Sequence, residues 1–293
     1  MFGLRDDPMM QLALLGSPLP GEGAVILGDQ RLVVGGQVVV NYLDPYGCAP
    51  EVTDRTPRTH APQNITIHTT TGQPHDPVLV PDPATETRVC ELAHYQTNTD
   101  REVSWDFTVA TVGLITQQND PTRWYTWQAG NVNGYAVGIE NEQGPGGVLY
   151  KPGVRAFVAL CDTLTRGLKI QRMVPVVWRN GVPVPDRRVL DRFLAAYGSG
   201  SSWYGLYGHR NVTPQRGPGD PGDVLIYALL AAGYEGFDVQ AGQDLDVWAM
   251  RQRELGVPAT GIPGPETVAA IDARSSRFFP RFRQGLWVWR PGD

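Results

Sequence analysis

Two of the five histidines in this chain, His68 and His209, stand at the ends of segments with the pattern of β-strands. In NITIHT (64–69), side chains alternate between two faces, so the isoleucines point into the core and His68 points to the opposite side. WYGLYGH (203–209) ends in the same way at His209. Imidazole is a general base and the commonest metal ligand, so a pair of such histidines could do chemistry.

A carboxylate stands at a comparable place in a third strand-like segment, GYAVGIEN (134–141). Alternation places Glu140 on the same face as two small residues, Ala136 and Gly138. We expect these small residues to leave room above the sheet for a ligand. If the three strands are neighbours, two imidazoles and one carboxylate converge over one open face, as a catalytic metal requires.

The third candidate ligand is Asp220, in GHRNVTPQRGPGDPGD (208–223). A catalytic zinc ion takes three protein ligands and leaves one position for water, and His68, His209 and Asp220 meet that count. The pKa of such a water falls towards neutrality, which makes hydroxide available as a nucleophile. Glu140 would then bind no metal, but would take the proton of the water and pass it to the leaving group.

Each of these residues also has an ordinary explanation. A histidine at the end of a strand is usually structural or exposed, and a glutamate in a strand is usually an edge or surface residue. Asp220 precedes Pro-Gly, where aspartate commonly forms a turn or caps a helix. It is the joint occurrence of all four residues that favours a metal site.

The elements that would hold these residues indicate an α/β fold, a mixed β-sheet flanked by helices, with a small helical domain at the C-terminus. Val154, Phe157, Cys161 and Leu164 recur at helical spacing after Pro152, which predicts a strong helix. Gly35-Gly36 predicts a hairpin turn. The other predicted elements are helices at 84–98, 187–197 and 221–232, strands at 104–110 and 112–117, an irregular loop at 44–63 and a linker at 233–243.

Composition sets limits on the partners. The 41% of hydrophobic residues supports an ordinary core, and the net charge of −5 disfavours a nucleic-acid partner. No apolar run is long enough to span a membrane, and the N-terminus lacks the pattern of a secretory signal, so we expect export by another route. The three cysteines are expected to be small buried residues, and a bridge between Cys90 and Cys161 is the alternative.

Four blocks of the chain resemble, in order, the type 2 N-acetylmuramoyl-L-alanine amidases, which include phage endolysins and peptidoglycan recognition proteins. The blocks cover about residues 60–232. NITIHTT resembles the first zinc-histidine strand of the family, and SWDFTVATVGLITQ resembles its hairpin. YTWQAGNVNGYAVGIENE resembles the W-H-A-G segment and the strand ending in G-I-E, and GHRNVTPQRGPGDPG resembles the block G-H-R-D-V-x-P that closes on D-P-G.

The resemblance implies that His68, His209 and Asp220 bind Zn²⁺ and that Glu140 is the catalytic acid and base. It implies a substrate-binding groove for muramic acid and its stem peptide, lined by Trp127, for which core packing is the alternative. Three departures from the family pattern matter, the first being that the block between His209 and Asp220 is one residue longer than usual. Gln128 replaces the histidine of W-H-A-G, so a hydrogen bond to the substrate is expected to differ. Pro218 replaces the family lysine, and Arg216 is the nearest cation that could stabilise the oxyanion.

AMRQRELGVPATGIPGPETVAAI, in the C-terminal part of the chain, resembles a peptidoglycan-binding domain of the three-helix type, with an ordinary helical hairpin as the alternative. The predicted organisation is an N-terminal extension without assigned role (1–45), a zinc amidase domain (46–233) and a peptidoglycan-binding-like module with its tail (234–293).

The predicted function is cleavage of the bond between muramic acid and L-alanine in bacterial peptidoglycan. The enzyme would be a phage endolysin, passing from the host cytoplasm to the cell wall after holin-mediated release, or a lysin carried in the virion with phage particle proteins as partners. The alternatives are a non-catalytic peptidoglycan receptor, a structural phage component with the amidase fold, and an enzyme of cytosolic muropeptide recycling.

Overall fold

The computed structural model describes residues 23–41, 55–70, 77–80, 87–179, 182–187, 205–213, 216–217 and 219–238, with a few more residues between 252 and 270. The chain divides into two compact units. The first comprises Met1–Arg172 and Arg188–Leu225, and the second comprises Met173–Arg187 and Ile226–Asp293. In the described part of the chain, no helix is long and apolar enough to cross a membrane.

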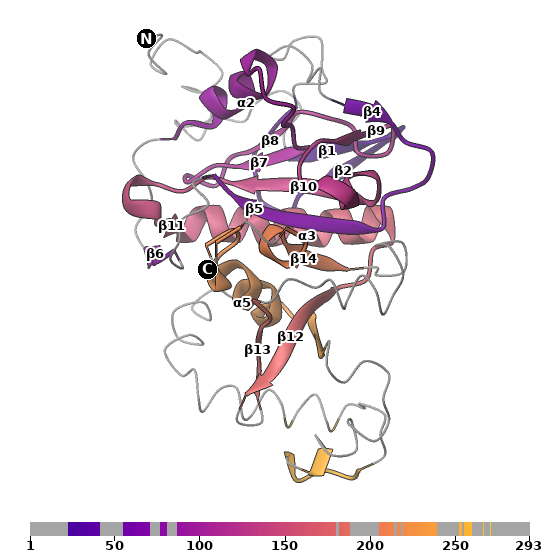
Figure 1. Cartoon of the computed structure of the whole chain (residues 1–293), viewed down its shortest axis with the longest axis vertical. Coiled ribbons are helices and arrows are strands. Elements are labelled where there is room, and N and C mark those ends of the chain that lie inside the picture. Colours follow the sequence, from indigo (N-terminus) through magenta and orange to yellow (C-terminus); the bar gives the residue numbers. More distant parts are fainter. Residues whose placement is uncertain are drawn as a thin grey trace. The chain divides into compact units, whose positions relative to one another are not determined.

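A six-stranded mixed sheet forms the centre of the first unit, as Figure 1 shows. β14, β5, β10 and β7 run parallel to one another, β8 is antiparallel to β7, and β3 lies parallel to β8 at the edge. In sheet order the strands are β14 (Leu206–Gly208), β5 (Asn64–Thr69), β10 (Ala136–Asn141), β7 (Phe107–Val109), β8 (Ile115–Gln117) and β3 (Val39–Asn41). The expected mixed sheet is confirmed, and the three strands that carry the candidate residues are neighbours.

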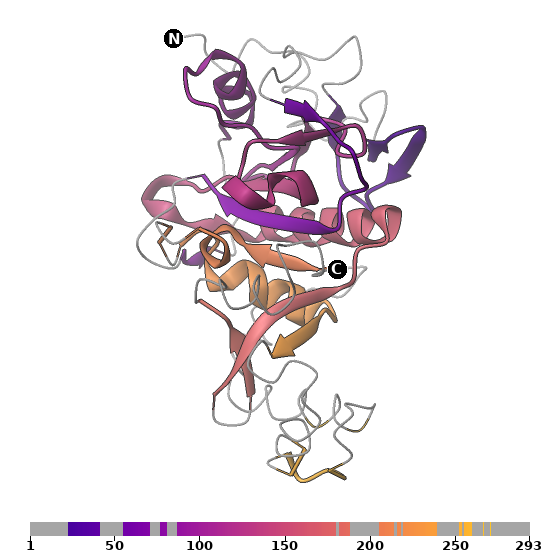
Figure 2. The same ribbon diagram turned by 45° about the vertical axis from the view of Figure 1, so that its right-hand side comes forward.

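Helix α3 (Lys151–Leu168) packs against β7 and β8, and it runs along the sheet in both views (Figures 1 and 2). Pro152 lies in its first turn, and its apolar stripe is buried, as the sequence pattern predicts. Cys161, on this stripe, is a buried free thiol, so the disulfide alternative does not apply to it. The helix ends at Lys169, which adopts the left-handed conformation with φ 57°.

The other elements of the first unit are short. β4 pairs with β9 and β6 pairs with β11, and α2 packs against β7. Glu142, just after β10, fixes the start of α2, because its carboxylate accepts hydrogen bonds from the Arg88 amide and the Thr87 hydroxyl. The bounds are α2 (Val89–Asn98), η2 (Gly130–Tyr135), η3 (Pro145–Gly147), η4 (His209–Asn211), β4 (Arg55–Pro57), β6 (Leu79–Val80), β9 (Trp124–Thr126) and β11 (Leu149–Tyr150).

The hairpin near the N-terminus differs from the prediction. β1 (Ala24–Leu27) and β2 (Gln30–Val33) pair across Gly28, whose φ of +63° suits a tight turn, so the expected hairpin turn at Gly35-Gly36 is wrong. Gly35-Gly36 does form a turn, with the Gln37 amide donating to the Val34 carbonyl at 3.0 Å. After this turn, however, the chain joins the six-stranded sheet as β3 and does not return along β2.

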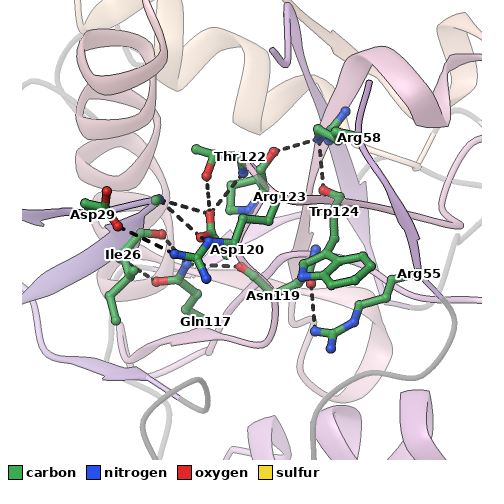
Figure 3. A network of polar contacts seen from close by, with 12 residues as sticks. Ile26, Asp29, Arg55, Arg58, Gln117, Asn119, Asp120, Thr122, Arg123 and Trp124 are labelled. Carbon is green, nitrogen blue, oxygen red and sulfur yellow. Dashed lines mark hydrogen bonds and ion pairs between the residues drawn. The ribbon is translucent and has the colours of Figure 1, made fainter. Parts of the chain in front are cut away.

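A polar network holds the hairpin of β1 and β2 to the sheet (Figure 3). The Gln117 side chain exchanges two hydrogen bonds of 2.7 Å with the main chain of Ile26. The Asp120 carboxylate accepts from the Gly28 amide at 3.2 Å and lies 3.3 Å from the Arg123 guanidinium. Residues from the segment expected to be an extension are therefore tied to the sheet that carries the site.

The second unit contains a three-stranded sheet in the order β13-β12-β15, from β13 (Val182–Pro185), β12 (Met173–Arg179) and β15 (Glu235–Asp238). The sequence pattern did not predict β12 or β13, and β15 lies within the expected linker at 233–243, which is therefore wrong for residues 235–238. Helix α5 (Asp223–Ala231) matches the helix predicted at 221–232. The predicted helix at 187–197, the first 22 residues and most of the predicted wall-binding module lie outside the described residues.

Candidate metal centre

The register of the central strands brings the candidate residues to one end of the sheet. Glu140 in β10 is directly opposite His68 in β5, so both side chains lie on the same face of neighbouring strands. Gly208 of β14 is opposite Ile67, and His209 follows at the start of a 3-10 turn. All six residues of β5 and of β10 are buried. The strands therefore fix His68 and Glu140 directly, and β14 leads straight into His209.

Three buried side chains meet at this end of the sheet. The Nδ1 atom of His209 lies 3.1 Å from one carboxylate oxygen of Asp220, and the Nδ1 atom of His68 lies 3.9 Å from the other. The two imidazole rings stand edge to face, with centroids 4.5 Å apart. One potential ligand atom from each residue lies within 4.8 Å of the others. The structure thus brings His68, His209 and Asp220 together as the sequence predicts.

Main-chain contacts hold Asp220 in place. Its carboxylate accepts a hydrogen bond of 3.1 Å from the amide of Thr69, the residue after His68. Its own carbonyl accepts from the Arg210 amide, next to His209, at 2.8 Å. The Thr69 hydroxyl also donates to the Gly219 carbonyl. The loop that carries Asp220 is therefore fastened beside both histidines, 152 and 11 positions away in sequence.

Burial sets the charge state of these groups. It lowers the pKa of His68 to about 3, helped by the neighbouring His209, so His68 is neutral at physiological pH and keeps a lone pair for a metal. Burial also raises the pKa of Glu140 well above its ordinary value, as does the charge of Asp220, while Arg216 lowers it. For Asp220, burial acts to raise the pKa, but the hydrogen bond with His209, the neighbouring imidazoles and the Thr69 amide outweigh it and lower the pKa.

The residues present fit a zinc ion. Two imidazole nitrogens and one carboxylate oxygen are donors of the kind found in catalytic zinc sites. Bonds of about 2.0–2.1 Å in a tetrahedron put ligand atoms about 3.4 Å apart. Each histidine Nδ1 lies near that distance from the Asp220 oxygen that faces it, at 3.1 Å for His209 and 3.9 Å for His68. His209 Nδ1 is buried and faces the Asp220 carboxylate, so the two groups could share one ion.

The two charged groups proposed to assist the chemistry lie beside these ligands. Glu140 is buried, and no hydrogen-bond donor among the described residues contributes to the pKa of its carboxylate, which leaves it available to a water. The Nε atom of Arg216 lies 3.7 Å from the Asp220 carboxylate, and its side chain is 42% exposed. Arg216 therefore places a partly exposed cation beside Asp220. Pro218, at the place of the family lysine, lies outside the described residues.

The two residues predicted to bind substrate have different surroundings. Trp127 is 39% exposed, so packing in the core does not explain it. Gln128 is buried, and its side-chain oxygen lies 2.9 Å from His68 Nε2. Its amide fills the space above Gly138, so the expectation that this space is open for a ligand is wrong. The sequence pattern did not predict the contact between Gln128 and His68, which are 60 positions apart. Gly138 was the available signal, because a glycine in a strand can mark a place where another side chain packs closely.

Comparison with known proteins agrees with this geometry. The profile of the N-acetylmuramoyl-L-alanine amidase family matches residues 58–223, more than half of the chain, and the chain belongs to that family. The match contains His68, Glu140, His209 and Asp220 and ends at the start of α5. No curated protein sequence matches significantly.

Several solved structures are similar. A mutant endolysin from Bacillus subtilis has 23% identity, covers 46% of this chain and 80% of its own, and gives a TM-score of 0.33. The catalytic domain of XlyA has 20% identity, covers 64% and 95%, and gives a TM-score of 0.35. The Ph2119 endolysin from Thermus scotoductus MAT2119 bacteriophage Ph2119 has 14% identity, covers 60% and 87%, and gives a TM-score of 0.34.

Proposed function

We propose that the protein is a zinc-dependent amidase that hydrolyses the bond between the lactyl group of N-acetylmuramic acid and L-alanine in bacterial peptidoglycan. The observation that carries the proposal is the meeting of His68, His209 and Asp220 beside the buried carboxylate of Glu140. Family membership supports the reaction class, since the matched region includes all four residues.

The zinc ion would be held by His68, His209 and one oxygen of Asp220. When bound, zinc lowers the pKa of a water and polarises the scissile carbonyl. Glu140 would accept the proton of the attacking water and return it to the departing amino group of L-alanine. Its buried position suits the second step, because burial favours the protonated form that this step needs.

Two further residues would act on the substrate. The guanidinium of Arg216 stands 3.7 Å from Asp220 and would stabilise the negative charge that develops on the carbonyl oxygen. Arginine has a different reach from lysine, so this role needs the substrate to approach from the exposed side of Arg216. The partly exposed Trp127 would offer its ring to muramic acid or to the stem peptide.

The proposal extends to biological setting. The chain would act as a phage endolysin that reaches the wall after holin-mediated release, or as a lysin carried in the particle. The sequence at 249–271 would hold the enzyme at peptidoglycan, which raises its effective concentration at the substrate. Mass spectrometry of intact particles distinguishes the two settings, since only a virion lysin is found among particle proteins.

The proposed reaction is tested with purified protein and peptidoglycan by following newly exposed L-alanine amino groups. We expect release with Zn²⁺, none with a chelator, and none with His68→Ala. Because His68 is buried, Glu140→Gln is the better-matched variant, with nearly the same shape. Peptidoglycan binding without release by the zinc-loaded wild type would refute the enzyme and favour a receptor or structural component of this fold.

A further inference from the structure

Gln128 lies beside the candidate metal ligand His68, on the side of its ring away from Asp220. Its Oε1 atom is 2.9 Å from His68 Nε2, whereas the other ring nitrogen, Nδ1, is the one that faces Asp220. Both side chains are buried, at 8% and 4% exposure, so water does not compete freely for the contact. The imidazole is thus held between the amide on one side and the ligand cluster on the other.

The surroundings of Gln128 decide which end of its amide faces His68. Its Nε2 group donates to the Ala136 carbonyl at 3.4 Å, and a carbonyl can only accept, so the oxygen must point at the imidazole. The main chain is held as well, because the amides of Gln128 and Ala129 both donate to the Asn133 side chain, at 3.0 and 2.7 Å. The acceptor therefore has a fixed position and orientation.

The Gln128 oxygen, a hydrogen-bond acceptor, favours one tautomer of the His68 imidazole. A neutral imidazole carries one N–H and one lone pair, and an amide oxygen can bond only to the N–H. The proton is therefore on Nε2, and the lone pair is on Nδ1, towards Asp220 and His209. Without Gln128, the tautomer protonated on Nδ1 would become more populated, because its N–H could donate to the Asp220 carboxylate 3.9 Å away after a small shift. That form has no lone pair for the metal.

Gly138 makes the contact sterically possible. A Cβ atom at this position would lie 2.3 Å from Gln128 Oε1 and 2.7 Å from its Cδ, far inside contact distance. The Gly138 backbone cannot withdraw, because its amide donates to the Asp106 carboxylate at 2.7 Å and its carbonyl accepts from the Asp106 amide at 3.1 Å. The glycine is therefore required by the side chain above it.

We propose that Gln128 is a positioning residue for the metal centre, which holds His68 in the form whose Nδ1 can bind the ion, and that Gly138 provides the space for it. The inference rests on the proposed metal site and goes further, since it assigns to Gln128 a role in metal affinity. A direct contact of Gln128 with substrate is the competing explanation.

The test measures metal affinity, independently of turnover. Dissociation constants for Zn²⁺ and Co²⁺ are obtained by competition with a chromophoric chelator. We expect Gln128→Met to weaken binding about 10–100-fold, the range found when groups that orient metal-bound histidines are removed. Gln128→Glu keeps an acceptor and should stay within a few fold of wild type. Gln118→Met is the matched control, a buried glutamine directly after β8 whose side chain donates to Thr108 and Thr116.

Gly138→Ala provides a second route to the same defect. The new methyl group must displace Gln128, so metal affinity should fall as in Gln128→Met although the glutamine is still present. In a Gln128→Ala background the space is free, and adding Gly138→Ala should cost little more. Long-range ¹H–¹⁵N correlation spectra of the metal-free protein should place the His68 proton on Nε2 in the wild type and on Nδ1, in part, in Gln128→Met.

The outcomes separate this inference from the proposed function. If the wild type binds neither metal, the metal site itself is wrong. If the wild type binds metal and Gln128→Met binds it equally well with the same His68 form, the positioning role is refuted and the amidase proposal stands. Unchanged metal affinity with a raised KM would assign Gln128 to the substrate. Thermal unfolding of each variant against Gln118→Met shows whether a loss of affinity comes from misfolding.

Discussion

Asp106 is a completely buried carboxylic acid, and its titration should make the stability of the fold depend on pH. Burial raises its pKa from 3.8 to about 6, although Arg58 and hydrogen bonds from Asn119, Gly138 and Thr126 act in the opposite direction. The folded state thus binds the proton more tightly than the unfolded state. The stabilisation from this group is fully present below about pH 4 and is lost as the pH rises through 6.

The size of the effect follows from the two pKa values. Each tenfold difference in proton affinity corresponds to about 1.4 kcal/mol, so a pKa raised from 3.8 to about 6 gives about 3 kcal/mol of unfolding free energy in total. About 2.4 kcal/mol of this is lost between pH 4 and pH 7, because the unfolded carboxyl is already partly ionised at pH 4. Asp106→Asn removes the titration and also one hydrogen-bond acceptor. The lost acceptor adds an offset independent of pH, so the pH-dependent part of the difference between the two proteins isolates the carboxylic acid.

The assay is urea unfolding at intervals from pH 4 to pH 7, with a chelator present so that metal binding does not contribute. We expect the stability of the wild type relative to Asp106→Asn to fall by about 2.4 kcal/mol across this range. Asp29→Asn, which removes a fully exposed carboxylate, controls for the loss of a charge. A constant or rising difference would refute the reasoning, because it would mean that Arg58 and the three donors outweigh burial.

Three further predictions concern single residues. Glu140→Gln should lower the rate of amide hydrolysis by about 10²–10⁴-fold while Zn²⁺ affinity stays within a few fold, because the carboxylate transfers protons and binds no metal. Steady-state kinetics measure the rate, and competition with a chelator measures the affinity. Arg216→Ala should lower kcat more than it changes metal affinity, and Arg216→Lys should restore part of the rate; equal rates for all three proteins would remove Arg216 from catalysis. Glu142→Gln should destabilise the fold by about 1.5–3 kcal/mol in urea unfolding, because the carboxylate accepts from Thr87, Arg88 and Thr111.

The sequence predicted those parts of the fold whose signal is local. The alternation in NITIHT and the helical spacing after Pro152 each match one element of the structure, β5 and α3. The meeting of His68, His209 and Asp220 was predictable because each lies at the end of a recognisable strand or in a loop that resembles a family block. Alternation alone did not show that β14, β5 and β10 are neighbours, since pairing joins residues more than 60 positions apart.

The errors in the predicted fold have a common physical cause. The residue pattern of one strand does not show which other segment will pair with it or pack on it. Gly35-Gly36 has the composition of a hairpin turn, but the strand that follows finds its partner in β8 instead of β2. The segment Glu235–Asp238 has no alternating pattern and is a strand because β12 lies beside it. The space above Gly138 was expected to be open because the strand offers only small residues there, and a side chain from a different segment fills it.

The burial of so many polar groups at one end of the sheet is itself an argument for a bound cation. Removing carboxylates such as Asp220 and Glu140 from water costs free energy unless opposite charge compensates, and the charge of Asp220 raises the pKa of Glu140 further. Among the described groups that act on the Glu140 pKa, only Arg216 is positive, and it is partly exposed. A divalent ion between His68, His209 and Asp220 would supply the missing positive charge. The polar residues of this centre are therefore better explained as a ligand set with its general base than as a part of the core.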